Sequence, residues 1–329
     1  MNRRDFLKNT AGAALFTGAI PLLKSNSLAA QRKLDKIGLQ LYSVRQLMQQ
    51  DFTGTLTRVA QAGYDEVEFA GYYNQSPEAV KALLQELKIT SPANHSQYNT
   101  LKEDTIEQTI AAAKIIGHSY LILPSLPMEF PRAGGQRPPQ GSQTGQTLPA
   151  DQQPPKPEGQ QGQPPQQPQP RPRPQMPAFT LEKVKEFAAI FNRVGETCKK
   201  AGLGFAYHNH TMEFQKIEGS EDIMYDVLLK ETNPDYVGYE LDLGWAVAAG
   251  ADPLAYFEKF PGRFPFFHVK DMNAEKQSVI EGQGIIDFAS IFAQSAKAGV
   301  KYYIVEYEGR EEPMASVEAC VKYLKNLTF

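Results

Sequence analysis

The chain has 329 residues, a net charge of −3 and 41% hydrophobic residues, which is the composition of a globular protein. The charge leaves no excess of basic residues for a nucleic-acid-binding surface, so we expect no nucleic acid among its partners. The two cysteines, Cys198 and Cys320, have no CxxC spacing and fall in segments of helical pattern. This arrangement disfavours a thiolate metal site and favours two free thiols.

Residues 1–30 have the pattern of an export signal. The pair Arg3-Arg4 is followed by Phe6-Leu7-Lys8, by an apolar stretch at 11–23 and by small residues at 25–30. The apolar stretch is shorter than a membrane span. We therefore predict a cleaved signal of the twin-arginine type, a periplasmic location, and no membrane association after cleavage.

A second segment, residues 131–177, differs in composition from the rest of the chain. It is dominated by Pro, Gln and Gly and holds more than half of the 24 prolines. Such a segment cannot bury enough apolar surface to offset its ordering entropy. We predict a disordered Pro/Gln/Gly-rich insertion on the protein surface.

The remaining residues, 31–130 and 178–329, alternate regularly between strand-like and helix-like segments, and we predict a single domain. Glycines follow several of the helix-like segments, as they do at helix C-termini. Eight strands alternating with helices predict an α/β protein with a (β/α)8 TIM-barrel fold, in which the insertion follows strand four. The expected strands are 37–44, 66–70, 89–95, 120–123, 204–210, 237–243, 264–270 and 302–307. The expected helices include 52–62, 77–87, 104–116, 181–201, 222–229, 288–298 and 316–327.

Polar residues gather where these strands end. Barrel enzymes carry their catalytic groups at the C-terminal ends of the strands, and residues i and i+2 of a strand point to the same face. Four of the five histidines occupy such ends, while His118 precedes a strand and is expected to be structural. The strand-end residues are His95, His208, His210 and His268, with the carboxylates Glu68, Glu240, Asp242, Glu306 and Glu308.

A buried cluster of imidazoles and carboxylates is unstable unless its members are paired or bind a cation. Two histidines and two carboxylates around an open position suit one divalent ion of Mn, Co, Zn or Fe. Magnesium fits less well because it prefers an all-oxygen shell. The sequence therefore predicts a divalent-metal site at the barrel mouth.

Several motifs in this order resemble the xylose isomerase-like barrel family, the sugar phosphate isomerase/epimerase group. The resemblance covers about residues 35–327. The motifs are Gly63-Tyr64-Asp65-Glu66-Val67-Glu68, His208-Asn209-His210, Glu240-Leu241-Asp242-Leu243-Gly244-Trp245, His268-Val269-Lys270-Asp271, Gly282-Gln283-Gly284-Ile285-Ile286-Asp287 and Val305-Glu306. The resemblance implies one metal ion held by His208, Asp242, His268 and Glu306.

The resemblance also implies a sugar or keto-sugar substrate from which a proton next to a carbonyl is removed. We assign acid/base roles to Glu306, His210 and Lys270. Residues expected to bind the substrate are Glu68, His95, Glu213 and Trp245. The chain departs from the family pattern where His208 replaces a common Glu and where Trp245 replaces a common His. Of the two metal-bound glutamates used by epimerases, only Glu306 is therefore present.

Three classes of function remain open at this point. The first is a metal-dependent isomerase or epimerase, with a lyase, dehydratase or hydratase of keto-sugars or glycosides as its alternative, because both begin with the same proton abstraction. The second is a non-catalytic sugar-binding barrel. The third is a nuclease of the endonuclease IV type, which needs several metal ions and more histidines than this mouth offers, and a polyanionic substrate that an acidic chain does not attract.

Overall fold

Eight short parallel strands close into a barrel in the computed structural model, which describes residues 32–128 and 179–329. Around the barrel the strand order is β1-β10-β7-β6-β5-β4-β3-β2. Most strand residues are buried, as expected of a parallel sheet covered by helices. The predicted (β/α)8 TIM barrel is confirmed. The barrel strands are β1 (Gly38–Gln40), β2 (Glu66–Phe69), β3 (Thr90–His95), β4 (Tyr120–Leu123), β5 (Gly204–His208), β6 (Gly238–Asp242), β7 (Phe266–Val269) and β10 (Tyr302–Val305).

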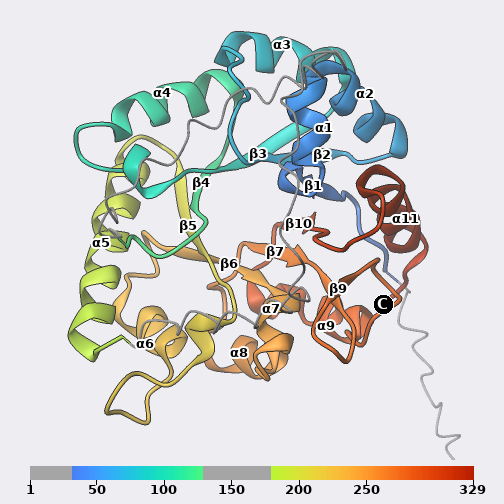
Figure 1. Ribbon diagram of the computed structural model, residues 1–329. Helices are drawn as coiled ribbons and strands as arrows, with labels where there is room; N and C mark the ends of the chain where they lie inside the picture. The colour runs from blue at the N-terminus through green and yellow to red at the C-terminus, as the bar shows by residue number, and fades with distance from the viewer. Residues whose placement is uncertain (1–31, 129–178) are drawn as a thin grey trace, which may run out of the picture.

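The helices form a ring outside the strands (Figure 1). Their ends follow local chemistry: Ser76 caps α3 by accepting a hydrogen bond from the Ala79 N–H, and α2 ends at Gly63, whose φ of 101° suits glycine. The helices are α1 (Arg45–Gln50), α2 (Phe52–Ala62), α3 (Pro77–Leu87), α4 (Ile106–Ile116), α5 (Leu181–Lys200), α6 (Met224–Glu231), α7 (Leu243–Ala248), α8 (Pro253–Lys259), α9 (Phe288–Ala293), α10 (Ser295–Ala298) and α11 (Pro313–Asn326).

Seven of the eight strands are shorter than predicted, and the first and the fifth are examples. The first ends at Gln40, because the Gln40 side chain accepts a hydrogen bond from the Tyr42 N–H and starts a 3-10 turn at Leu41–Val44. The fifth ends at His208, so His210 lies beyond the strand. An antiparallel pair absent from the prediction, β8 (Asp271–Met272) with β9 (Ser278–Val279), extends the loop after β7.

The barrel interior is layered along the strands. An apolar layer is formed by Ala93, Ile122, Ala206, Phe266 and Ile304, with Tyr120 and Tyr302 packed against it. Two residues further along four of these strands lie His95, His208, His268 and Glu306. Because strand residues i and i+2 share a face, a polar layer stacks on the apolar one toward the C-terminal mouth.

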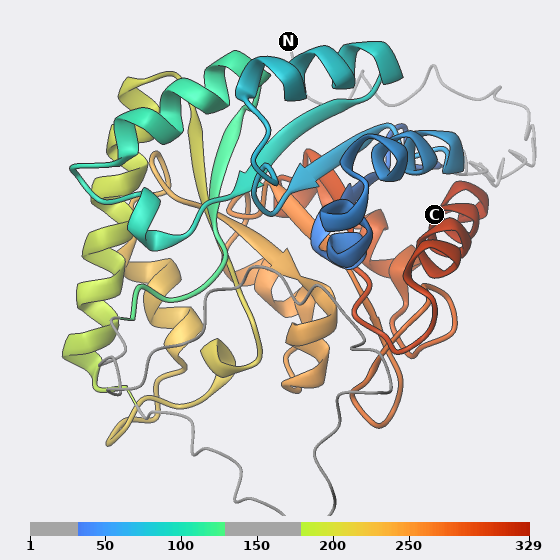
Figure 2. The same cartoon turned by 45° about the horizontal axis from the view of Figure 1, so that its top comes forward.

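The two ends of the described chain meet at one side of the barrel. Helix α11 lies beside α2 in both views (Figure 1 and Figure 2), and the Tyr64 hydroxyl donates to the Val317 carbonyl oxygen at 2.7 Å. These contacts close the ring of helices between its first and last members.

The remaining predictions concern the cysteines, the insertion and the N-terminal segment. Cys198 and Cys320 are free and buried in helices, as predicted. Residues 129–178 lie between β4 and α5, so the insertion follows strand four as expected. The predicted export signal and the predicted disorder of 131–177 fall outside the described residues. Among the helices within 32–128 and 179–329, none is long and apolar enough to cross a membrane.

Candidate metal centre

The four ligands that the sequence resemblance implies come together at the barrel mouth. His208, Asp242, His268 and Glu306 belong to, or directly follow, four consecutive strands of the barrel, β5, β6, β7 and β10. Each offers a donor atom within 4.8 Å of the others, and all four side chains are buried. We call this set the outer quartet.

Asp242 divides its two carboxylate oxygens between structure and site. Oδ1 caps helix α7 by accepting a hydrogen bond from the Trp245 N–H at 2.7 Å. Oδ2 is buried and accepts no hydrogen bond, with Lys270 Nζ at 3.2 Å. The cap fixes the Asp242 carboxylate at the end of β6 and leaves Oδ2 without a hydrogen-bond donor among the described residues.

His268 lies between two pairs of carboxylates. Its Nδ1 is 3.0 Å from Glu306 Oε2 and 3.9 Å from Asp242 Oδ2. Its Nε2 is 2.8 Å from Glu68 Oε2 and 3.1 Å from Glu240 Oε2. Burial lowers the pKa of His268, but Glu240 and Glu306 outweigh burial and hold this pKa well above its ordinary value.

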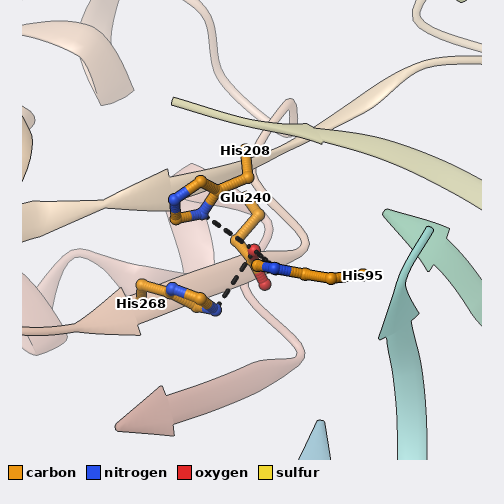
Figure 3. Close-up of side chains that lie close together, drawn as sticks. All are labelled: His95, His208, Glu240 and His268. Atoms are coloured by element: carbon orange, nitrogen blue, oxygen red, sulfur yellow. Dashed lines mark hydrogen bonds and ion pairs between the residues drawn. The ribbon is translucent and has the colours of Figure 1, made fainter. Parts of the chain in front are cut away.

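Deeper in the barrel, one carboxylate oxygen is surrounded by imidazoles (Figure 3). Glu240 Oε2 lies 2.8 Å from His95 Nε2, 3.0 Å from His208 Nδ1 and 3.1 Å from His268 Nε2. We call these four residues the inner quartet; their donor atoms also lie within 4.8 Å of one another. The sequence pattern placed Glu240 at a strand end without a role. Its i, i+2 spacing from Asp242 was the signal that could have assigned one.

Lys270 is the only buried lysine in the part of the chain that the structure describes. Its Nζ lies 2.9 Å from Glu306 Oε2, 2.7 Å from Glu308 Oε2 and 4.4 Å from the centre of the Trp245 ring. Burial lowers the pKa of Lys270, but the surrounding carboxylates raise it above its ordinary value. Lys270 is therefore a fixed positive charge beside the outer quartet.

His210 and Glu213 have different positions. The His210 ring lies 4.8 Å from the His208 ring, between centroids, and burial together with Lys270 lowers the pKa of His210 to about 4. Glu213 is fully buried and accepts hydrogen bonds from the Tyr207 hydroxyl and the His210 N–H. The structure therefore joins Glu213 to the barrel wall and to the His210 backbone, whereas the sequence pattern predicted a substrate-binding residue.

His118 has the structural role expected from the sequence. Its Nδ1 is 2.9 Å from the Ser91 carbonyl oxygen and its Nε2 is 3.1 Å from the Tyr72 hydroxyl. Burial lowers the pKa of His118 to about 4. It is held apart from the strand-end histidines by these hydrogen bonds.

The chemistry of the donors fits a divalent cation. Four buried carboxylates share this cluster with the Lys270 ammonium and the His268 ring, whose pKa is raised, and the remaining excess of negative charge in a low dielectric requires compensation. Three of their oxygens accept no hydrogen bond from the described residues: Glu68 Oε1, Glu240 Oε1 and Asp242 Oδ2. The carboxylates are those of Glu68, Glu240, Asp242 and Glu306. Imidazole and carboxylate together are typical ligands of first-row transition metals.

A cavity of about 570 Å³ opens beside the cluster. Trp245 and Glu308 line this cavity and both contact Lys270. Tyr42, Arg45 and Arg310 line its other walls. A volume of this size is typical of a small-molecule site. The cavity is built from the loops that follow β1, β6, β7 and β10, at the C-terminal mouth.

Comparison with known proteins agrees with the barrel fold. The model of a family described as "Xylose isomerase-like TIM barrel" matches residues 56–327. A sugar phosphate isomerase/epimerase from Parabacteroides distasonis is 25% identical, with a TM-score of 0.66 over 89% of this chain and 98% of that chain.

Two further relatives match a smaller part of the chain or have a lower sequence identity. An inosose dehydratase from Lacticaseibacillus casei is 25% identical over 155 residues, which are 42% of this chain. The chain spans about half the length of the curated relatives it matches. An IOLI protein with a bound zinc atom shares the fold, with a TM-score of 0.58 at 14% identity over 87% of this chain and 95% of that chain.

Proposed function

Because the chain belongs to the xylose isomerase-like TIM barrel family, we propose that it is a divalent-metal-dependent isomerase or epimerase of a sugar or keto-sugar. The observation that carries the proposal is the convergence of His208, Asp242, His268 and Glu306 at the mouth, with donor atoms within 4.8 Å. Two imidazoles and two carboxylates beside a sugar-sized cavity suit proton abstraction next to a carbonyl.

We propose that the outer quartet holds one divalent ion. The mixed nitrogen and oxygen donors favour Mn²⁺, Co²⁺, Zn²⁺ or Fe²⁺ over Mg²⁺, and the IOLI protein of the same fold carries zinc. When bound, such an ion acts as a Lewis acid that polarises a carbonyl and makes the adjacent C–H more acidic.

The side chains around the outer quartet include candidate proton acceptors and a surface for binding a sugar. His210, with its pKa lowered to about 4, is neutral at pH 7 and can accept a proton. Glu306 is the second candidate base, and Lys270, 2.9 Å from it, keeps it ionised. Trp245 lines the cavity and offers a face on which a sugar ring can stack.

The inosose dehydratase relatives support a second candidate, a dehydratase of a keto-sugar or cyclic polyol ketone. It shares the first step, removal of the proton next to the carbonyl, and differs in the second. Return of the proton gives an isomer or epimer, whereas loss of a β-hydroxyl group gives a dehydrated product. The two candidates are therefore distinguished by the product.

Metal analysis combined with a substrate panel in deuterated water tests the proposal. We expect protein reconstituted with Mn²⁺, Co²⁺ or Zn²⁺ to bind one ion and to exchange the substrate's α-hydrogen for deuterium. An isomeric product supports the first candidate, and an unsaturated or dehydrated product supports the second. Failure to bind any of the three ions contradicts both. Binding of sugar without exchange indicates a non-catalytic sugar-binding barrel.

The variant Glu306→Gln separates metal binding from proton transfer. The amide keeps an oxygen at the same position but removes a base, so we expect metal to remain while α-hydrogen exchange slows by about 10²–10⁴-fold. Metal content and deuterium incorporation are measured on the same preparation. Exchange at the wild-type rate would exclude Glu306 as the base and leave His210.

We also propose that the protein is exported to the periplasm through the twin-arginine pathway. The support is the pattern of residues 1–30, with its arginine pair Arg3-Arg4. Fractionation of cells that express Arg3→Lys with Arg4→Lys tests this proposal: the precursor should then remain in the cytoplasm.

A further inference from the structure

Two buried carboxylates outside the outer quartet contact its imidazole rings. Glu68 and Glu240 both have no exposed surface. Burying an ionised carboxylate is unfavourable unless charges and hydrogen bonds compensate it. Two such groups in the polar layer therefore require an explanation in terms of what they contact.

Both carboxylates contact ring nitrogens of the outer quartet. Glu240 Oε2 is 3.0 Å from His208 Nδ1, and Glu68 Oε2 is 2.8 Å from His268 Nε2. Glu68 is itself held by Gln40, whose Nε2 donates to the same oxygen at 2.9 Å. Each imidazole of the outer quartet thus has one nitrogen held by a carboxylate from outside that quartet, and the other nitrogen of His268 lies beside Glu306, which belongs to it.

One explanation is a second cation within the inner quartet. His208 and His268 belong to both quartets. Filling both quartets would require each of these two rings to bind a cation through both nitrogens. A neutral imidazole has one N–H and one lone pair, so it can bind one cation only. Two bridging rings would both have to lose their remaining N–H proton, which makes simultaneous occupation unfavourable.

The geometry points to a different role: Glu68 and Glu240 are positioning residues that fix the tautomer and orientation of His268 and His208 toward the outer site. This inference rests on the proposed metal site and adds residues that act through its ligands. A ligand histidine commonly donates its second N–H to a carboxylate, which orients the ring and raises its basicity.

With an ion bound, this arrangement assigns a role to each ring nitrogen. Glu240 takes the N–H at Nδ1 of His208, so Nε2 of this ring carries the lone pair. Glu68 takes the N–H at Nε2 of His268, which leaves Nδ1, 3.0 Å from Glu306 Oε2, as the nitrogen that would give up its proton to a bound ion. The two rings would therefore bind the ion through different nitrogens. His95 Nε2, 2.8 Å from Glu240 Oε2, helps to hold the Glu240 carboxylate in place.

Cobalt binding to carboxylate variants tests this assignment. We expect wild-type protein to bind one Co²⁺ per chain. Glu240→Gln and Glu68→Gln should each weaken Co²⁺ binding by about 10–100-fold, as measured by competition with a chelator, and should shift the visible absorption bands of the bound ion. Glu240→Ala should weaken binding further, because the Gln amide can still accept one N–H. At saturating Co²⁺ the Gln variants should recover most of kcat.

Glu281→Gln is the matched control. Glu281 is a buried carboxylate in the loop after β9, outside both quartets, and its replacement should leave Co²⁺ affinity and spectrum unchanged. Thermal unfolding of the metal-free proteins shows that each variant is folded. The Gln variants keep the shape of the side chain, so they remain informative if Glu240→Ala does not fold.

Nitrogen NMR of the zinc-loaded protein gives a readout independent of affinity. His208 should be protonated at Nδ1 and His268 at Nε2, and Glu240→Gln should alter the His208 signal. The opposite tautomers would overturn the assignment, as would variants with wild-type affinity and spectrum. Two ions in the wild type and one in Glu240→Ala would make Glu240 a ligand instead. Absence of binding by the wild type overturns the proposed metal site itself, which distinguishes the two failures.

Discussion

At the scale of single residues, Glu281 carries an unusual charge state. It is 1% exposed, and its carboxylate lies beside the Cys320 thiol without a hydrogen bond from any N–H or O–H group of the described residues. Burial raises the pKa of Glu281 to about 8. The folded state therefore favours the protonated form, and the stability that this form provides is lost as the pH rises from the ordinary carboxyl range through 8.

Glu281→Gln should accordingly change the pH dependence of stability. The amide cannot ionise, so we expect the variant to be more stable than the wild type at pH 9, by on the order of a few kcal/mol, with a much smaller difference near pH 5. Chemical denaturation at both pH values measures this, with the exposed Glu218→Gln as control. A difference that does not depend on pH would show that Glu281 is ionised in the folded protein.

At the scale of elements, Asp271 organises the loop after β7. Its carboxylate accepts hydrogen bonds from the backbone N–H groups of Met272, Gly282, Gly284 and Ile286 at 2.9–3.3 Å. Gly282 has a φ of +86°, and a Cβ on Gly284 would lie 2.2 Å from Asp271 Oδ1. The two glycines of the Gly282-Gln283-Gly284 motif therefore allow the loop backbone to approach the Asp271 carboxylate closely.

Asp271→Asn should loosen this loop, because the amide nitrogen cannot accept the two N–H groups that Oδ2 accepts. We expect a loss of about 1–3 kcal/mol and faster hydrogen exchange at residues 280–287. Asp252→Asn is the control, since Asp252 caps α8 through a single acceptor that Asn can replace. Unchanged exchange in Asp271→Asn would mean that the loop is held by other contacts.

At the scale of the whole molecule, metal binding should be linked to folding. Convergence of the outer quartet requires four strands, so the unfolded chain cannot bind the ion in the same way. With free metal at about 100 times its Kd, linkage adds about 2.7 kcal/mol of stability. We expect Co²⁺ or Zn²⁺ to raise Tm and a chelator to reverse the change, whereas Asp242→Ala should abolish the response. A Tm that does not depend on metal would contradict the site.

The segment 131–177 should contribute little to this stability. Its only large apolar residues are Leu148 and Met176, and β4 and α5 already flank it as parts of the barrel. We expect deletion of residues 134–175 to change Tm by no more than a few degrees and to leave metal content intact. A larger fall would show that the segment packs on the barrel.

The class of fold and the position of the site could both be predicted from the sequence. Strand and helix periodicity and the glycine at helix ends, such as Gly63, are local signals. Parallel strands in a closed barrel bring their C-terminal ends together. For this reason polar strand-end residues were expected to meet at the mouth. The family resemblance implied His208, Asp242, His268 and Glu306 as one set, and the structure brings these four together.

The orientation of the side chains within the cluster depends on tertiary packing. Glu68 and His268 are 200 residues apart, and which ring nitrogen meets which carboxylate depends on side-chain packing across the barrel. No local pattern reports that choice. The same applies to Glu213, for which substrate binding stays a prediction: its hydrogen bond from the Tyr207 hydroxyl depends on how the 3-10 turn at Met212–Phe214 packs against β5.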